Sequence, residues 1–231
     1  MKQVLDRLVD KISQANMDPL PSDNFYMEDV FDAATYSNIL KNLPRDDSYH
    51  FINHPDAVLP DGTATRMLLD LTDDTINRLH PENQHFWREM KDVFVSQALL
   101  QAVLNKFQGE ITKRFGANWP EMVLVPIFYR DFPGYKIGVH TDAPFKIATM
   151  QFYFPSDESQ LHLGTSFHVR KGDFFHLLKT NSFKPNSGYA FVRTDCSWHS
   201  VRQLGVNETK RDSLALTVYV KGEEYSSGKG Y

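Results

Sequence analysis

The sequence predicts a mainly β protein with flanking helices, in which a jelly-roll core packs against N-terminal α-helices. Three observations lead to this fold class. Apolar residues recur at helical spacing mainly in the first 120 residues. From residue 121 onward, short aromatic and β-branched runs recur instead, separated by turn-forming residues. No helical pattern lies between those runs, which favours an antiparallel sandwich or barrel over a parallel α/β sheet.

The N-terminal part is expected to be helix and loop that supports a sheet. Its expected helices are residues 4–12, 33–43 and 82–107, and its expected strand is residues 65–71. Asp32 is a suitable cap for the second helix, and Pro44 ends it. The third stretch is the longest periodic one and begins after Pro81. Gly109 lies just beyond its end and can break it.

The C-terminal part is expected to form the strands of the core. These strands are residues 122–129, 136–140, 147–154, 165–169, 188–193, 197–204 and 213–220. Pairs such as Pro133-Gly134 and Lys171-Gly172 mark turns between them. Neither a linker nor a repeat marks a boundary near residue 120. We therefore predict one domain, residues 1–231, with a helical support region, residues 1–120, and a β core, residues 121–221.

Composition and charge narrow the class of protein. Of the 231 residues, 41% are hydrophobic and 23% are charged, which suits a folded core and excludes a disordered, collagen-like or coiled-coil chain. The formal net charge is −4 and the basic residues are scattered, so no nucleic-acid partner is expected. Cys196 is the single cysteine, so nothing requires an oxidising compartment and a cytoplasmic location is expected. The longest apolar run is too short to span a membrane.

A His-x-Asp pair lies at the end of one predicted strand. Because side chains alternate along a strand, His140 and Asp142 face the same side and Thr141 faces the other. An imidazole and a carboxylate placed in this way form a two-point metal clamp. A second match, His54-Pro55-Asp56, lies in a proline-rich loop with no strand pattern around it. We therefore assign that second match to a turn.

Two later strands supply residues that fit the same site. His199 lies in the predicted strand of residues 197–204 and can deliver a third ligand. Two histidines and one carboxylate form the facial triad of non-haem Fe(II) oxygenases. Farther along, alternation aims Arg211 and Ser213 to one side of the last strand. A guanidinium and a hydroxyl together suit a dicarboxylate co-substrate.

The order and spacing of these residues resemble the Fe(II)/2-oxoglutarate-dependent oxygenase superfamily. The match covers residues 129–220, and the stretch from Tyr129 to Tyr135 is similar to small bacterial and phage members with a prolyl-hydroxylase-like layout. The resemblance implies a double-stranded β-helix. It also implies that His140, Asp142 and His199 are catalytic residues that hold Fe(II).

The resemblance also implies a co-substrate site and a reaction. Arg211 and Ser213 would bind the far carboxylate of 2-oxoglutarate, and Tyr129 could also reach this co-substrate. The implied enzyme is a dioxygenase that uses O₂, with ascorbate as an auxiliary reductant, and that releases succinate and CO₂. Members that halogenate lack the carboxylate ligand, whereas Asp142 is present, so hydroxylation of a C–H bond is expected.

Two other functions remain open at this point. A cupin-like metalloenzyme without 2-oxoglutarate would share the jelly roll and the histidine ligands, but it leaves Arg211 and Ser213 unexplained. A non-catalytic jelly-roll binding module predicts no tightly bound metal and no effect of changing His140. Within the leading hypothesis the substrate is a small molecule or a side chain of a larger one. Its identity and the oligomeric state are left open by the sequence.

Overall fold

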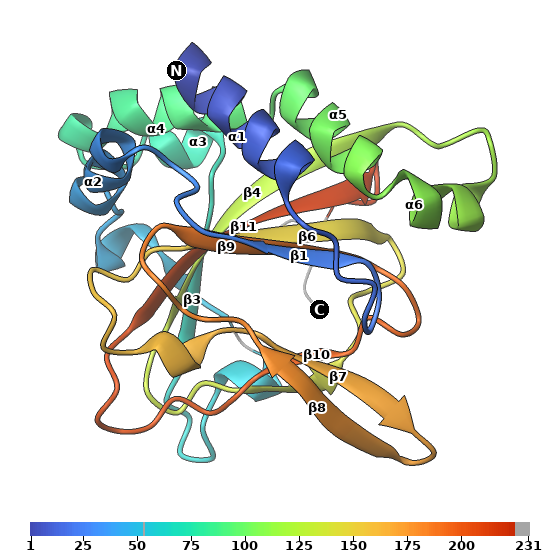
Figure 1. Ribbon diagram of the computed structural model, residues 1–231. Coiled ribbons are helices and arrows are strands. Elements are labelled where there is room, and N and C mark those ends of the chain that lie inside the picture. The colour runs from blue at the N-terminus through green and yellow to red at the C-terminus, as the bar shows by residue number, and fades with distance from the viewer. Residues whose placement is uncertain (53, 225–231) are drawn as a thin grey trace.

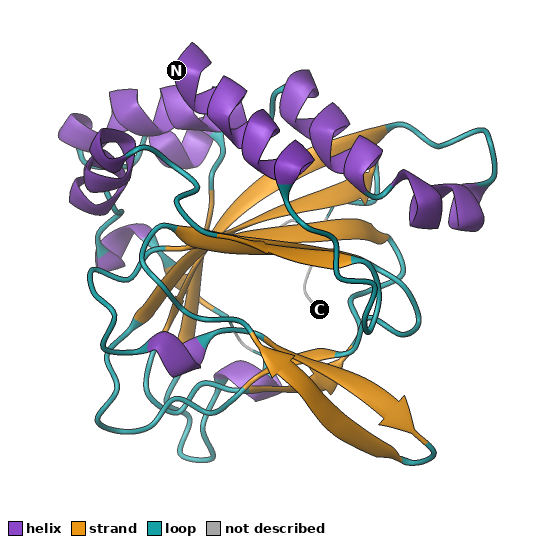
Figure 2. Ribbon diagram, viewed as in Figure 1, coloured by secondary structure: helices purple, strands orange, loops and turns teal. Residues whose placement is uncertain are grey.

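The computed structural model describes residues 1–52 and 54–224, which fold into two antiparallel sheets with helices over one of them (Figures 1 and 2). The larger sheet has the strand order β1-β9-β6-β11-β4-β3-β2, and the smaller has the order β5-β10-β7-β8. From β4 onward the chain alternates between the two sheets, apart from the β7–β8 hairpin, which stays in the smaller one. This winding is a double-stranded β-helix, so the predicted fold class is confirmed.

The strands of the two sheets have the following bounds. The larger sheet contains β1 (Asn24–Met27), β2 (His50–Phe51), β3 (Arg66–Asp70), β4 (Met122–Asp131), β6 (Lys146–Tyr153), β9 (Ser187–Val192) and β11 (Arg211–Val220). The smaller sheet contains β5 (Ile137–His140), β7 (Ser166–Lys171), β8 (Phe174–Thr180) and β10 (His199–Val201). Within the described residues, neighbouring strands pair in antiparallel fashion, as the absence of helical patterns between the strands predicted.

The helices cover the outer face of the larger sheet (Figure 1). They are α1 (Lys2–Gln14), α2 (Ala33–Lys41), α3 (Asp73–Ile76), α4 (Pro81–Phe94), α5 (Gln97–Lys106) and α6 (Gln108–Phe115). The expected helix of residues 82–107 is in fact two, because the Ser96 hydroxyl caps a new helix by accepting a hydrogen bond from the Leu99 amide at 3.3 Å. In the described ranges, no helix is long and apolar enough to cross a membrane.

Two differences from the expected strands have clear physical causes. The first 120 residues add not only β3 but also the short strands β1 and β2 to the larger sheet, so they extend the β core as well as support it. Short edge strands of this kind carry little alternation for sequence analysis to detect. Strand β8 was not expected, and its apolar residues are exposed, with Phe174 74% exposed. A strand that buries neither face shows no period-two pattern.

Apolar packing on both faces of the larger sheet fixes the position of the site. On the helix side, Trp87 packs edge-on against Phe128 with ring centroids 4.8 Å apart. Between the two sheets, a separate aromatic cluster contains Tyr153, Phe167 and Phe191. Because both faces are covered, β9 and β11 are buried almost throughout, and polar side chains between the sheets are removed from solvent. A site in this interior is therefore built on strands that are packed on both faces.

Candidate metal centre and its cavity

A cavity of about 970 Å³ lies between the two sheets. Strands β3, β4, β5, β6, β9, β10 and β11 all contribute side chains to its wall. The volume matches the upper part of the range for small-molecule sites, so both a co-substrate and part of a substrate fit inside. The residues predicted from sequence as ligands, His140, Asp142 and His199, all line this cavity.

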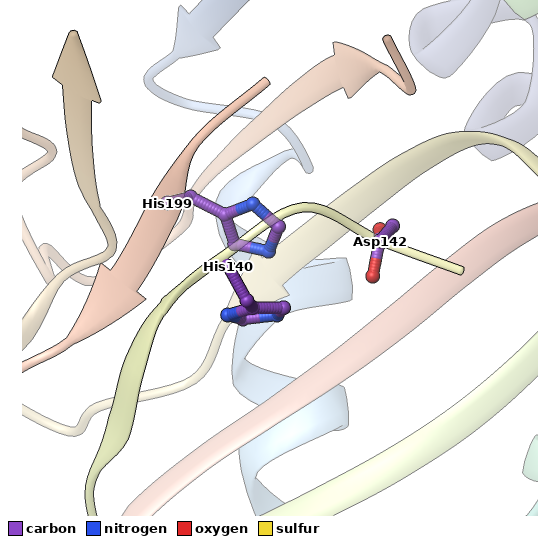
Figure 3. A group of neighbouring side chains, drawn as sticks. All are labelled: His140, Asp142 and His199. Atoms are coloured by element: carbon purple, nitrogen blue, oxygen red, sulfur yellow. The ribbon is translucent and has the colours of Figure 1, made fainter. Parts of the chain in front are cut away.

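The structure brings these three residues together (Figure 3). His140 ends β5 and faces His199 of β10 directly across the strand pair. Their ring centroids lie 4.2 Å apart. Asp142 follows two residues later in the turn after β5, and one potential ligand atom from each residue lies within 4.8 Å of the others. Two histidine-bearing strands and one turn thus converge on a single point.

Backbone carbonyls orient both imidazoles. Nδ1 of His140 lies 2.9 Å from the Gly138 carbonyl oxygen, and Nδ1 of His199 lies 2.9 Å from the Ser197 carbonyl oxygen. A carbonyl oxygen only accepts, so each Nδ1 carries the proton and donates it. This assignment leaves Nε2 of each ring with a lone pair, which is how histidine binds a metal ion.

The Asp142 carboxylate is held by two donors. Its Oδ1 accepts a hydrogen bond from Lys146 Nζ at 2.7 Å, and its Oδ2 accepts one from Thr149 Oγ1 at 2.7 Å. Burial alone would raise the pKa of Asp142, but the Lys146 charge, the nearby His199 and these two hydrogen bonds lower it well below its ordinary value. The carboxylate is therefore ionised and fixed in orientation.

Burial favours the neutral form of His199, which is the form that can bind a metal ion. Removal from solvent lowers the pKa of His199 from 6.5 to about 4, although the Asp142 charge opposes the change. At neutral pH the ring is therefore neutral, as a metal ligand must be. A neutral imidazole, a second oriented imidazole and a fixed carboxylate fit a mononuclear non-haem Fe(II) ion. The described residues of the chain thus provide a suitable donor set for the metal that the sequence predicted.

The low pKa of His199 makes the metal-free protein sensitive to acid. Unfolded His199 takes up a proton near pH 6.5, whereas folded His199 does so only near about 4. The contribution of neutral His199 to the free energy of unfolding is complete above pH 6.5. It decreases by about 3 kcal/mol in total as the pH falls toward 4. Urea unfolding across this interval measures the loss, and His199→Gln is the control. If the free energy of unfolding has the same pH dependence in chelator-treated wild type and chelator-treated His199→Gln, the prediction is contradicted.

Arg211 supplies a buried cation with one guanidinium nitrogen that no described residue contacts by a hydrogen bond. Its Nε donates to the Leu163 carbonyl oxygen at 2.8 Å, and its Nη1 donates to Asp131 Oδ2 at 2.7 Å. Within residues 1–52 and 54–224, its buried Nη2 has no hydrogen-bond partner. Arg211 is fully buried and lines the cavity. An unsatisfied donor on a buried charge is costly, so an anion in the cavity would stabilise it. The far carboxylate of 2-oxoglutarate fits this requirement.

The other two predicted co-substrate residues, Tyr129 and Ser213, differ in whether they line the cavity. Tyr129 lines the cavity from β4 and lies opposite Ser213 of β11. Ser213 is fully buried, and its hydroxyl accepts a hydrogen bond from Gln151 Nε2 at 2.7 Å. Gln151 Oε1 in turn accepts one from the Tyr189 hydroxyl at 2.6 Å. Among the described residues, Gln151 and Tyr189 line the cavity, whereas Ser213 does not.

Several residues of the site escaped the sequence analysis. Asp131 pairs with Arg211, and Arg66 pairs with Asp131. Because Asp131 lies two residues after Tyr129, alternation along the strand could have pointed to it. Arg130, between Tyr129 and Asp131 on β4, faces the other side of the sheet and pairs with Asp212 at 2.6 Å.

The second His-x-Asp match also contributes to the cavity. The assignment of this match to a turn is confirmed by a short 3₁₀ helix, Pro55–Ala57. Both His54 and Asp56 nevertheless line the cavity. In the described part of the chain, neither belongs to the group that could hold a metal ion. This turn therefore contributes to the wall and not to the centre.

The fold is similar to those of solved 2-oxoglutarate–Fe(II) oxygenases. A prolyl-4-hydroxylase from Pseudomonas putida is 14% identical over 94% of this chain and 100% of that one, with a TM-score of 0.50. A prolyl hydroxylase from Trichoplax adhaerens, solved with a hypoxia inducible factor peptide fragment, is 10% identical over 95% and 90%, with a TM-score of 0.52. The alpha ketoglutarate dependent epimerase SnoN from nogalamycin biosynthesis is 9% identical over 98% and 93%, with a TM-score of 0.55.

These structures define the class of fold. The chain has the double-stranded β-helix of the 2-oxoglutarate–Fe(II) oxygenases over nearly its whole length. No protein-family model and no curated protein matches the sequence. Since fold alone does not assign a reaction, the function must be argued from the residues of the cavity.

Proposed function

We propose that the protein is an Fe(II)- and 2-oxoglutarate-dependent dioxygenase that hydroxylates a C–H bond of a small molecule or of a side chain. The observation that carries this proposal is the buried Nη2 of Arg211, which has no partner among the described residues and lies in the same cavity as His140, Asp142 and His199. A metal site alone would need no buried cation beside it. A metal site with a cation directed at an anionic co-substrate matches the requirements of 2-oxoglutarate.

The protein's own groups would have separate tasks. His140, Asp142 and His199 would hold Fe(II) on one side, which leaves the remaining positions for ligands from the cavity. When bound, Fe(II) and 2-oxoglutarate together supply the activation of O₂, with succinate and CO₂ as products. Arg211 would bind the far carboxylate, with Tyr129 in the adjacent wall.

Other residues hold this arrangement in place. Lys146 and Thr149 fix the two oxygens of Asp142. Ser213 would act on the co-substrate side through Gln151, whose amide it accepts. Phe167 and Phe191, in the aromatic cluster between the sheets, pack against the imidazole of His199, with ring centroids 6.4 and 4.6 Å from it. Polar groups that are fixed in advance around a buried site stabilise developing charge more strongly than water does.

The competing functions explain less of the cavity. A cupin-like metalloenzyme without 2-oxoglutarate gives no reason for the open Nη2 of Arg211. A non-catalytic module gives no reason for three oriented metal ligands. The presence of the Asp142 carboxylate favours hydroxylation over halogenation within the proposed class. The exposed free thiol of Cys196 is compatible with the reducing cytoplasm, where we place the enzyme.

Turnover of 2-oxoglutarate tests the proposal. The purified protein is incubated with Fe(II), ascorbate, 2-oxoglutarate and air, and succinate is measured first without substrate and then with pools of amino acids, peptides and sugars. Succinate should form slowly alone, rise with the pool that contains the substrate, and disappear when a chelator removes the metal. Protein that holds Fe(II) and forms no succinate with any pool would contradict the proposal.

A further inference from the structure

Three charged side chains form a row across adjacent strands of the larger sheet. Arg66 of β3 lies directly opposite Asp131 of β4, and Asp131 lies directly opposite Arg211 of β11. Arg66 donates from Nε to Asp131 Oδ1 at 2.6 Å and from Nη2 to Oδ2 at 3.1 Å. Arg211 donates from Nη1 to the same Oδ2 at 2.7 Å. A single buried carboxylate is thus shared by two guanidiniums.

The row carries an excess of one positive charge. Arginine stays protonated in proteins, so Arg66 and Arg211 each carry a positive charge. The single carboxylate of Asp131 balances only one of these charges. If Asp131 faced Arg211 alone, that pair would be neutral and the open Nη2 would attract an anion only weakly. Because Arg66 engages both oxygens of Asp131, the row as a whole stays cationic. Arg66 therefore affects the charge that Arg211 presents to the cavity without taking the place of Arg211.

Two aromatic rings and the ion pair with Asp131 fix the position of the Arg66 guanidinium. Its guanidinium carbon lies 4.5 Å from the ring centroid of Tyr129 and 3.9 Å from that of Tyr135. Its side chain is 15% exposed, while that of Asp131 is fully buried. A guanidinium held by a bidentate ion pair and two aromatic rings has little freedom to move. Its charge is a permanent feature of the cavity wall.

From this row we infer that Arg66 is a positioning residue, which pairs with Asp131 and so keeps Arg211 effective for the far carboxylate of the keto-acid co-substrate. The inference rests on the proposed function, since it concerns the same cavity. It assigns to Arg66 and Asp131 a role in selecting a dicarboxylate over a monocarboxylate. Arg211 makes the contact, and the other two residues set its charge and direction.

The chain offers a matched control on the other face of the same strands. Arg130 and Asp212 lie opposite each other on β4 and β11, one residue along from Asp131 and Arg211. They form a buried ion pair at 2.6 Å, and Arg130 also pairs with Asp46. Among the described residues, none of these three lines the cavity. Changing Arg130 thus disturbs a similar buried pair in the same sheet without touching the cavity wall.

Comparison of two keto acids tests the inference. Binding of 2-oxoglutarate and of 2-oxopentanoate, which has the same chain length without the far carboxylate, is measured by anaerobic calorimetry on Fe(II)-loaded protein. Arg66→Gln should weaken 2-oxoglutarate binding at least about tenfold and leave 2-oxopentanoate unchanged. Arg66→Lys keeps the charge but loses the bidentate contact with Asp131, so it should keep a clear preference for 2-oxoglutarate and bind it more tightly than Arg66→Gln does. Arg130→Gln should leave the ratio of the two affinities unchanged.

Each contrary outcome has one meaning. If Arg66→Gln weakens both keto acids equally, or neither, the inference is overturned. If Arg66→Gln does not fold, a folded Arg66→Lys variant that loses the preference for 2-oxoglutarate overturns the role of charge. If the wild-type protein binds neither keto acid, the proposed function itself fails, and this result is distinct from a wild type that binds 2-oxoglutarate while Arg66 has no effect.

Discussion

Asp142→Ala is expected to lower 2-oxoglutarate turnover at least about a hundredfold, because even changes beside metal ligands cost ten- to a hundredfold. The variant removes the only carboxylate of the proposed triad and leaves two imidazoles. It also leaves Lys146 without the partner that its Nζ contacts at 2.7 Å. An ammonium near two imidazoles repels a divalent cation, so Fe(II) affinity should fall together with the rate.

Asp56→Ala is the matched control for this variant. Asp56 belongs to the other His-x-Asp sequence, and it also lines the cavity, but in the described chain it lies outside the group that could hold a metal. Its rate and Fe(II) content should remain within about twofold of wild type, as for most changes at partly exposed positions. Fe(II) content and succinate formation are measured for both variants. An Asp142→Ala protein that keeps its iron and its rate would refute the assigned ligand set.

The second large effect is expected at Arg211. Arg211→Met should weaken 2-oxoglutarate binding about a hundredfold, within the range for removal of one partner of a buried charge pair. The methionine fills the space between Tyr153 and Phe183, whose ring centroids lie 5.2 and 5.3 Å from the guanidinium carbon. Asp131 keeps its pair with Arg66, so the variant should fold. The KM for 2-oxoglutarate should rise far more than kcat falls.

Arg202→Met provides the comparison for Arg211→Met. Arg202 is a half-exposed arginine that pairs with Glu208 on the surface. Exposed ion pairs contribute little, so KM and stability should hardly change. The KM for 2-oxoglutarate of the two variants is measured in the same assay. An Arg211→Met protein with the wild-type KM would show that the co-substrate carboxylate binds elsewhere.

The metal ligands could be predicted from sequence because they follow local rules. A spacing of two residues keeps Asp142 close to His140, although β5 ends at His140, and His199 falls on β10, the strand that pairs with β5. The expected strand of residues 213–220 likewise corresponds to β11, which begins at Arg211. Alternating apolar residues between turn formers are the strongest signal a β core gives, and the core is where the expectations agree best with the structure.

The rest of the site depends on register between strands distant in sequence. Arg66 meets Asp131 because β3 and β4 pair with those residues opposite each other, and a shift of one residue would turn Asp131 to the helix side. Nothing local in the sequence specifies that register. The same limit applies to Gln151, which reaches Ser213 because β6 and β11 are neighbours. Cross-strand polar partners are therefore seen only in the fold.

The most direct test of the account is binding of 2-oxoglutarate to the anaerobic protein with and without Fe(II). Calorimetry separates binding from turnover, so an unknown substrate does not affect the result. With His140, Asp142 and His199 holding the metal and Arg211 at the other end of the co-substrate, the Fe(II)-loaded protein should bind one equivalent of 2-oxoglutarate. The chelator-treated protein should bind it much more weakly. Absence of binding to the iron-loaded protein, or equal affinity without iron, would contradict the account.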